Sequence, residues 1–344
     1  MTELLEKIQR QRHQKHAFVL FSLPESDMVS LYLYSDKELK PIVDFSECGF
    51  AFAPFNGQAL YLPTAESDVF NAQITYQKNE SDFDNSYDPE LKQPFMDLVS
   101  KGINAIAEGE FRKVVSARRE VVSYDKNWEA VLLNLFSSDR SAFRYCFYSE
   151  QTGMWMGATP EKLLSVTNRM LTTMSLAGTQ PYIEDSPIEW GQKEIDEQQF
   201  VTSFIAESLA DLNLKPELSD RKTARAGNIV HIRTDILAHV PDNINIKAIV
   251  NQLHPTPAVC GLPKAAALNF ILREEENREY YSGYLGLLNL VPGDIDLYVN
   301  LRSMKIDRQK ADIFVGCGVT SESDPESEFF ETVNKSVAMK KILT

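Results

Sequence analysis

The chain has 344 residues, enough for one large domain or two of ordinary size, and hydrophobic residues make up 43% of it. With 49 acidic against 35 basic residues, its formal net charge is −14 at pH 7. This excess of negative charge argues against binding to nucleic acids and to anionic membranes, because both depend on lysine and arginine. A small anionic substrate is still compatible with it, provided that a few cations surround the ligand locally.

The cysteines predict a reducing compartment. Cys48, Cys146, Cys260 and Cys317 are scattered and form no C-x-x-C pair, which favours reduced thiols over disulfides or a zinc site. The first residues, MTELLEKIQRQRHQKH, are polar and lack the apolar core of a signal peptide. No run approaches the length of a membrane-spanning helix. We therefore expect a cytoplasmic protein.

The predicted elements begin with short strands. Residues 17–62 alternate apolar runs (AFVLFSL, SLYLY, CGFAFAPF, ALYL) with turn signals, a pattern typical of strands. Residues 65–95 are polar and acidic, and we expect a loop or linker there. From about Pro94, FMDLVSKGINAIAEGE has the apolar spacing of a helix, and FRKVVSARREVVSY that of a strand carrying charges.

The rest of the chain mixes strands and helices. The runs FRYCFYS, GMWMGAT, KLLSVTN and RMLTTMS follow one another quickly, which predicts an antiparallel sheet. Helices are predicted over 188–210, 263–276 and 325–342. Three further strands are predicted at YYSGYLGLLNL, DLYVNLRSMKI and ADIFVGCGVT. This order indicates an α+β fold rather than a regular β-α alternation.

Two of the predicted helices carry glutamates three residues apart. Glu194 and Glu197 lie in KEIDEQQF, and Glu328 and Glu331 lie in PESEFFETVNK. Residues at i and i+3 share a helix face, where like charges repel by about 0.2–0.5 kcal/mol. A solvated helix surface would explain either pair alone. Two such pairs could instead supply the hard oxygen ligands that Mg²⁺ prefers.

Lys113 and Glu161 are candidates for proton transfer. Lys113 alternates with apolar residues in FRKVVSARRE, and such a lysine ordinarily lies at a solvated strand edge. A partly buried amine with a lowered pKa could instead act as a general base. Glu161 follows the turn in WMGATPEKLL and is either a cap or, if it is buried, an acid with a raised pKa.

Other residues could surround an anionic ligand. Arg302 in YVNLRS is predicted in the middle of a strand, where a guanidinium needs a partner. Lys335 follows Glu331 by four residues, so a helical salt bridge also explains it. The stretches AGTQ and GCG would let backbone N–H groups approach a ligand closely. His231 and His254 are more simply interpreted as structural.

The chain resembles the chorismate-utilising enzymes, a family that includes isochorismate synthase, salicylate synthase, anthranilate synthase component I and aminodeoxychorismate synthase. The resemblance rests on ordered motifs: FRKVVSAR, GATPEKLL, SLAGTQ, KEIDEQQF, HPTPAVCGLPK, REYYSGYLG, YVNLRS and FVGCGVTSESDPESEFFETVNK. It makes residues 92–344 the expected chorismate-binding core and residues 1–91 a variable N-terminal part of the same domain. It implies an α+β fold in which two large antiparallel β-sheets pack together, with helices outside.

The resemblance also implies roles for individual residues. Lys113 matches the general base, and Glu161 matches the general acid that protonates the departing C4 hydroxyl. Glu197 and Glu331 match direct ligands of Mg²⁺, while Glu194 and Glu328 match positions that hold metal waters or join the coordination. The positions matching substrate-binding residues are Gly178, Thr179, His231, Ala258, Tyr281, Arg302, Gly316 and Lys335.

Two positions divide the family by activity. Members that add water at C2 of chorismate have lysine at the position of Lys113, whereas members that add ammonia differ there and work with a glutaminase. Ala258 stands where salicylate-forming members typically have threonine. The resemblance therefore implies an Mg²⁺-dependent isochorismate synthase, serving menaquinone or siderophore synthesis, which is a monomer without a glutaminase subunit. The alternatives are a salicylate synthase, an ammonia-dependent synthase and a catalytically silent chorismate-binding paralogue.

Overall fold

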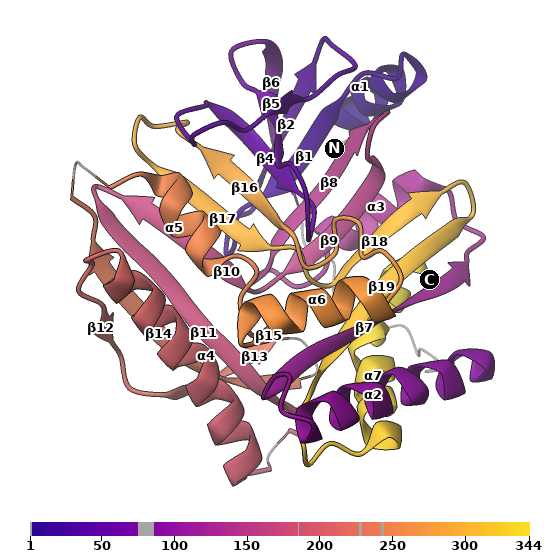
Figure 1. Cartoon of the computed structure of the whole chain (residues 1–344). Helices are drawn as coiled ribbons and strands as arrows, with labels where there is room; N and C mark the ends of the chain where they lie inside the picture. Colours follow the sequence, from indigo (N-terminus) through magenta and orange to yellow (C-terminus); the bar gives the residue numbers. More distant parts are fainter. Residues whose placement is uncertain (1, 75–85, 185, 227–228, 242–243) are drawn as a thin grey trace.

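Two antiparallel β-sheets dominate the computed structural model of the chain (Figure 1). The structure describes residues 2–74, 86–184, 186–226, 229–241 and 244–344. The first sheet contains, in spatial order, β15 (Gly261–Leu262), β7 (Lys113–Ser123), β19 (Lys310–Val319), β18 (Ser303–Asp307), β9 (Gly153–Thr159), β8 (Phe143–Ser149), β1 (Phe18–Ser22), β2 (Met28–Tyr34) and β6 (Ser67–Gln73).

The second sheet follows the same antiparallel pattern. Its order is β12 (Glu217–Leu218), β14 (Ile229–His239), β11 (Met170–Pro181), β10 (Lys162–Thr167), β17 (Ile295–Val299), β16 (Tyr284–Leu288), β4 (Gly49–Ala53), β5 (Leu60–Pro63) and β3 (Lys40–Pro41), with β13 (Lys222–Ala226) also paired to β14. The two sheets and their helices confirm the predicted α+β fold.

Aromatic side chains fill the space between the sheets. Phe52 of β4 stacks on Phe147 of β8, with ring centroids 4.2 Å apart, and both are fully buried. Trp155 of β9 stacks in turn on Phe314 of β19 at 5.3 Å. Burying rings of this size removes much apolar area from water, so this layer fixes how the sheets sit on each other.

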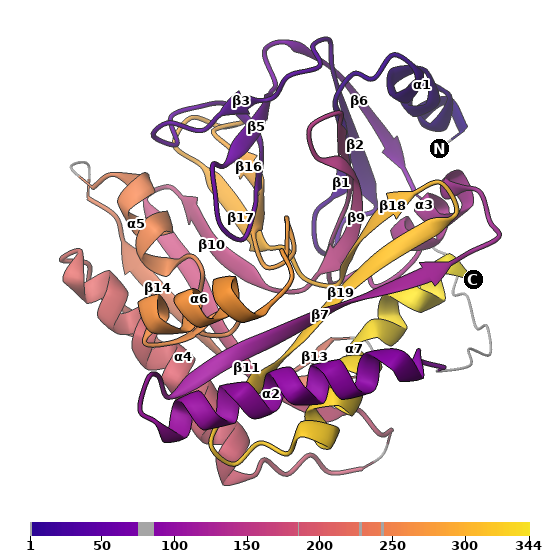
Figure 2. The same ribbon diagram turned by 45° about the vertical axis from the view of Figure 1, so that its right-hand side comes forward.

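Helices cover the outer faces: α1 (Thr2–His13), α2 (Lys92–Ala107), α3 (Trp128–Phe136), α4 (Gln192–Asp211), α5 (Ile246–Leu253), α6 (Lys264–Glu274) and α7 (Pro325–Leu343), with a 3₁₀ turn, η1 (Pro89–Leu91). Figure 1 shows α4 alongside the long strand β11, and Figure 2 shows α2 in front of β7 and β19. Among the helices that the structure describes, none is long and apolar enough to cross a membrane.

The end of α7 nearest the candidate site is fixed by local sequence. Asp324 caps the helix by accepting from the Ser327 N–H at 2.8 Å, and Pro325 occupies the first turn. Glu326 and Glu328 follow in that turn, where the helix dipole favours negative charge. This start orients Glu328 and Glu331.

The N-terminal segment belongs to both sheets. β1 pairs with β8 in the first sheet, and β4 pairs with β16 in the second. The strands before residue 92 therefore share their hydrogen-bond ladders with strands of the predicted core.

Two predictions about the elements are wrong. Ser67–Gln73, expected to be part of a loop, forms β6 at the edge of the first sheet; Phe70 and Ala72 pack against the core and alternate with exposed Asn71 and Gln73, a short apolar signal within an otherwise polar segment. Residues 75–85 of the same segment lie outside the described residues. DLYVNLRSMKI is not one strand: it forms β17 in the second sheet and β18 in the first. Arg302 therefore lies at the crossing between the sheets.

Candidate active site

A cavity of ≈ 110 Å³ is lined by strands of both sheets and by helices α4 and α7. It brings together most of the residues singled out in the sequence: Glu161, Gly178, Thr179, Glu197, His231, Ala258, Tyr281, Arg302, Gly316, Glu331 and Lys335. Lys113, Glu194 and Glu328 lie just behind this lining. Positions far apart in the chain are thus gathered around one hollow.

Lys113 is buried, so the expectation of a solvated strand edge is wrong. It begins β7, which runs between β15 and β19, and its side chain is 1% exposed. Its Nζ donates to Glu197 Oε1 at 2.7 Å. Burial alone would raise the pKa of Glu197, but Lys113, with Lys335 and Lys193 further away, outweighs burial and lowers it.

Glu161 is a buried carboxyl group rather than an exposed cap. It lies between β9 and β10, and the Val299 N–H donates to its carbonyl oxygen at 2.9 Å. Burial raises its pKa to about 7, although the positive charges of Lys113 and Lys335 act in the opposite direction. At neutral pH a large fraction of Glu161 therefore carries a proton that it can donate.

Arg302 presents a buried cation to the cavity. Its backbone has φ +46°, a left-handed conformation at the point where the chain leaves β17 for β18. The side chain is 14% exposed, and Nη1 lies 3.9 Å from Asp139 Oδ2. Burial lowers the pKa of Arg302, and the Asp139 carboxylate opposes this shift. A guanidinium in such a place suits a carboxylate ligand.

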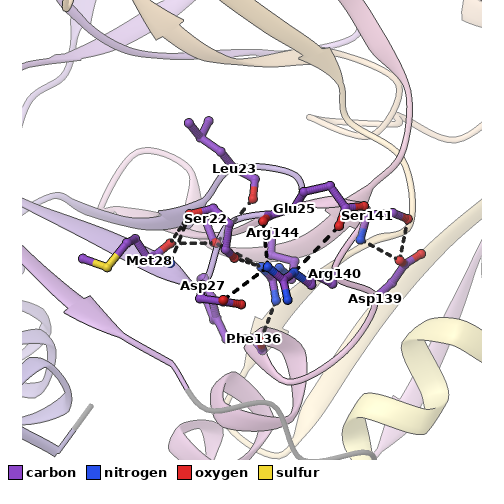
Figure 3. Close-up of polar contacts among 11 residues, drawn as sticks. Ser22, Leu23, Glu25, Asp27, Met28, Phe136, Asp139, Arg140, Ser141 and Arg144 are labelled. Atoms are coloured by element: carbon purple, nitrogen blue, oxygen red, sulfur yellow. Dashed lines mark hydrogen bonds and ion pairs between the residues drawn. The ribbon is translucent and has the colours of Figure 1, made fainter.

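A polar network fastens the loop that carries Asp139 (Figure 3). Asp139 Oδ1 accepts from the N–H and the hydroxyl of Ser141, at 3.0 and 2.6 Å. Arg140 lies 3.2 Å from Asp27, and the fully buried Arg144 donates to the Phe136 carbonyl at the end of α3, just before this loop, and to a backbone oxygen of the turn between β1 and β2. The N-terminal segment thereby supports a group that faces Arg302.

Three carboxylates, Glu197, Glu328 and Glu331, lie near enough to Lys193 for each to raise its pKa, and Glu328 and Glu331 also interact with each other. Glu328 is 3% exposed, and burial and the nearby Glu331 both raise its pKa. The Ser323 hydroxyl donates to Glu328 at 2.7 Å and partly offsets this. Glu197 approaches from α4 with its pKa lowered, as described above. Such crowding of like charge is favourable only beside a counter-charge.

Lysines supply that counter-charge in the structure. Lys113 pairs with Glu197 at 2.7 Å, Lys335 with Glu331 at 2.7 Å, and Lys193 with Glu328 at 3.3 Å. These three pairs come from β7, α4 and α7. Burial opposes the charge on Lys335, yet Glu331 outweighs burial and raises the pKa of Lys335.

The donor set suits a hard cation. Glu194, Glu197, Glu328 and Glu331 offer only carboxylate oxygens, which Mg²⁺ prefers to softer ligands. Within the part of the chain that the structure describes, no three His, Cys, Asp or Glu side chains already form a group that could hold a metal ion. The oxygen ligands of these glutamates suit a divalent cation, and in this structure lysines pair with three of them.

His231 is a neutral hydrogen-bonding group at the cavity. Its Nδ1 lies 3.1 Å from the Gly178 carbonyl oxygen and 3.2 Å from Thr179 Oγ1. Burial, then the charges of Arg302 and Lys335, lower the pKa of His231 to about 3. Because a carbonyl only accepts, Nδ1 carries the proton, which leaves Nε2 as an acceptor.

Glycines keep the backbone close to these groups. A Cβ at Gly318 would lie 2.5 Å from Glu197 Oε1 and 3.1 Å from Lys113 Cε, so a side chain there would displace the Glu197 carboxylate or the end of Lys113. Gly178 has φ +70°, and a Cβ there would lie 3.0 Å from Glu194 Cβ. Glycine at both positions is required for α4 to approach β11 and β19.

Comparison with known proteins identifies the family to which the chain belongs. A family model described as chorismate binding enzyme matches residues 61–344. The chain belongs to the chorismate-binding enzymes. This confirms the resemblance drawn from the motifs, and it extends the match to residues before 92.

Relatives of different activity share the chorismate-binding family. The chain is 31% identical over 259 residues to the salicylate biosynthesis isochorismate synthase of Pseudomonas aeruginosa, covering 72% of this chain and 54% of the relative. It is 28% identical over 265 residues to anthranilate synthase component 1 of Thermococcus kodakarensis, covering 73% of this chain and 60% of the relative. The chain thus spans little more than half the length of these relatives.

A solved structure shares the fold. The menaquinone-specific isochorismate synthase MenF of Escherichia coli superposes with a TM-score of 0.77 at 21% identity, covering 96% of this chain and 89% of that one. The near-complete coverage includes the N-terminal strands, so the whole two-sheet arrangement is that of chorismate-binding enzymes.

Sequence reasoning missed several residues that hold the cavity together. Arg278 and Glu275 form a fully buried pair at 2.7 Å, and Arg278 Nη1 donates to the Val259 carbonyl at 2.8 Å, next to Ala258. Asp139 and Lys193 were also missed. Arg278 lies in the motif REYYSGYLG and Lys193 begins the motif KEIDEQQF, so both motifs offered a signal; Asp139 has the sequence context of a surface charge.

Proposed function

We propose that this chorismate-binding enzyme is an isochorismate synthase, an isomerase that adds water at C2 of chorismate and expels the C4 hydroxyl. The observation that carries the proposal is that Glu161 lines the cavity and that Lys113 lies just behind the same lining. Glu161 has a pKa of about 7 and lies close enough to Lys113 to feel its charge. An amine and a carboxylic acid so placed can serve as base and acid on one substrate.

The proton balance of the reaction needs only these two groups. Lys113, which forms an ion pair with Glu197 in this structure, first loses a proton to solvent, and the neutral amine then takes a proton from the water whose oxygen bonds to C2. The ring double bond shifts as the C4–O bond breaks, and Glu161 donates its proton to the departing hydroxyl, which leaves as water. One water enters and one leaves, so substrate and product are isomers and the reaction is reversible.

Substrate binding rests on the cations around the cavity. Arg302 and Tyr281 would hold one carboxylate of chorismate, and Lys335 with the backbone at Gly316 would line the same side. His231 Nε2 would accept a hydrogen bond from a ring hydroxyl. These contacts fix the ring between Lys113 and Glu161, which lowers the entropic part of the barrier.

Magnesium is the cofactor that the acidic end would hold. Glu197 and Glu331 would bind it directly, with Glu194 and Glu328 beside them. When bound, Mg²⁺ would neutralise a substrate carboxylate and help to orient the ring. We propose water as the nucleophile because of Lys113, and we therefore expect a monomer that needs no glutaminase partner.

Product analysis tests this function. The purified protein is incubated with chorismate and Mg²⁺, with and without EDTA, and the products are separated chromatographically. Metal-dependent isochorismate at an amount comparable to chorismate, without pyruvate, is expected. Salicylate with pyruvate would favour a salicylate synthase, an ammonia requirement would favour an anthranilate-type synthase, and no conversion would favour a silent paralogue.

A further inference from the structure

Lys193 is a lysine in a place that the helix itself disfavours. It occupies the first turn of α4, which begins at Gln192. The N-terminus of a helix carries partial positive charge, so a cation there is disfavoured. The side chain nevertheless reaches Glu328 of α7, with Nζ 3.3 Å from Oε1. The ion pair with Glu328 offsets the unfavourable interaction of Lys193 with the helix dipole.

Lys193 differs from the other two lysines at the carboxylates. The Lys113 and Lys335 side chains are 1% and 26% exposed, and Lys335 lines the cavity. Lys193 lies outside the lining and is 42% exposed, whereas its partner Glu328 is 3% exposed. An ammonium on a flexible four-carbon stem at the surface can withdraw into water at little cost.

We infer that Lys193 is a built-in counter-ion for the acidic end of the cavity, which holds Glu328 when no divalent cation is present and weakens the binding of that cation. The inference rests on the proposed function, because it concerns the carboxylates assigned to magnesium. A positive charge beside Glu328 stabilises the metal-free carboxylates. The same charge repels an arriving cation, so metal affinity is set below what the carboxylates alone would give.

Calorimetric titration of the metal-free full-length protein with MgCl₂ tests this inference. Lys193→Met keeps the length of the side chain and removes its charge, and it should bind Mg²⁺ about 5–10-fold more tightly. Lys193→Arg keeps the charge and should keep the wild-type affinity. Lys101→Met is the matched control, because Lys101 also extends from a helix to a glutamate, Glu274, at 3.0 Å, far from the cavity.

The melting temperature measured in EDTA gives a second test of the inference. Lys193→Met should melt about 2 °C below the wild type, and saturating Mg²⁺ should remove the difference. Lys101→Met should show neither change in Mg²⁺ affinity nor rescue by Mg²⁺.

Two results would overturn the inference while leaving the proposed function intact. One is an unchanged Mg²⁺ affinity in Lys193→Met; the other is a weaker affinity, which would make Lys193 an organiser of the metal site. A wild-type protein that binds no Mg²⁺, with or without chorismate, would instead remove both the inference and the metal from the proposed function.

Discussion

Helix α7 has buried charges on two sides, and the two groups are built differently. On one side, Glu120 accepts from Lys340 through Oε1 at 2.6 Å and from Arg118 through Oε2 at 3.1 Å, and all three side chains are 5–6% exposed. On the cavity side, each of Glu197, Glu328 and Glu331 pairs with its own lysine through one oxygen.

The difference separates a structural group from a functional one. Both oxygens of Glu120 are held by cations, so the group is closed and ties α7 to β7. On the cavity side, Glu328 and Glu331 raise each other's cost of carrying charge, and Lys193, Lys335 and the Ser323 hydroxyl offset that cost. A buried group of charges is destabilised when one partner is removed, because the remaining charges are then uncompensated. Charged groups around a cavity can instead interact with a ligand.

Lys113 should give the largest functional effect. Replacing it by methionine removes the proposed base but keeps the volume, so turnover of chorismate should fall by about 10³-fold or more. Chromatographic assay of product formation measures this, with Lys101→Met as the control. Near-normal turnover in Lys113→Met would place the base elsewhere.

Glu120 should give the largest effect on stability. Glu120→Gln leaves Arg118 and Lys340 buried without their carboxylate, which should cost about 3–5 kcal/mol of unfolding free energy. Denaturant unfolding measures the loss. The control is Glu326→Gln at the exposed pair with Lys92, where about 0–1 kcal/mol is expected. Equal losses in the two variants would show that the closed group has no special role.

Glu197 tests the cavity side of the comparison. Glu197→Gln keeps the shape but removes a charged ligand, so the Mg²⁺ concentration for half-maximal activity should rise by about 10–100-fold. A titration of activity against MgCl₂ measures the shift. The same titration in Glu120→Gln should be unaltered at a temperature where that variant is folded. An unchanged curve for Glu197→Gln would remove Glu197 from the metal site.

Glu161 should give a smaller, pH-dependent effect. Its folded-state pKa of about 7 is above the ordinary 4.5. The stability that it contributes is therefore fully present below about pH 4.5 and is lost as the pH rises through about 7. Glu161→Gln should thus gain about 1–3 kcal/mol relative to the wild type between pH 4.5 and pH 8. Thermal unfolding across this range measures it, and a difference that does not vary with pH would contradict the raised pKa.

Much of the site could be predicted because its residues lie in short, recognisable motifs. The glutamate pairs share helix faces by spacing alone, and Glu161 follows a turn that brings it inside. Arg302 was misplaced because YVNLRS has the apolar character of a single strand, although the chain changes sheets there. Nothing local encodes such a crossing, which depends on how the two sheets pack.

Asp139 and Lys193 could not be predicted for a related reason. Their partners, Arg302 and Glu328, lie more than a hundred residues away in the chain. Lys193 begins the motif KEIDEQQF, but nothing local in either case names the partner, and only the tertiary fold brings the oppositely charged side chains within reach. In edge strand β6 the apolar alternation is confined to Phe70 and Ala72, too short a signal within a polar segment to predict a strand.

The central claim is that this cavity adds solvent water to chorismate. The most direct measurement is the reaction with chorismate and Mg²⁺ in water enriched in ¹⁸O, followed by mass spectrometry of the separated isochorismate. One ¹⁸O atom per product molecule, located in the C2 hydroxyl, is the predicted result. Isochorismate that carries no label would mean that the hydroxyl moves within the substrate, and it would contradict the roles given to Lys113 and Glu161.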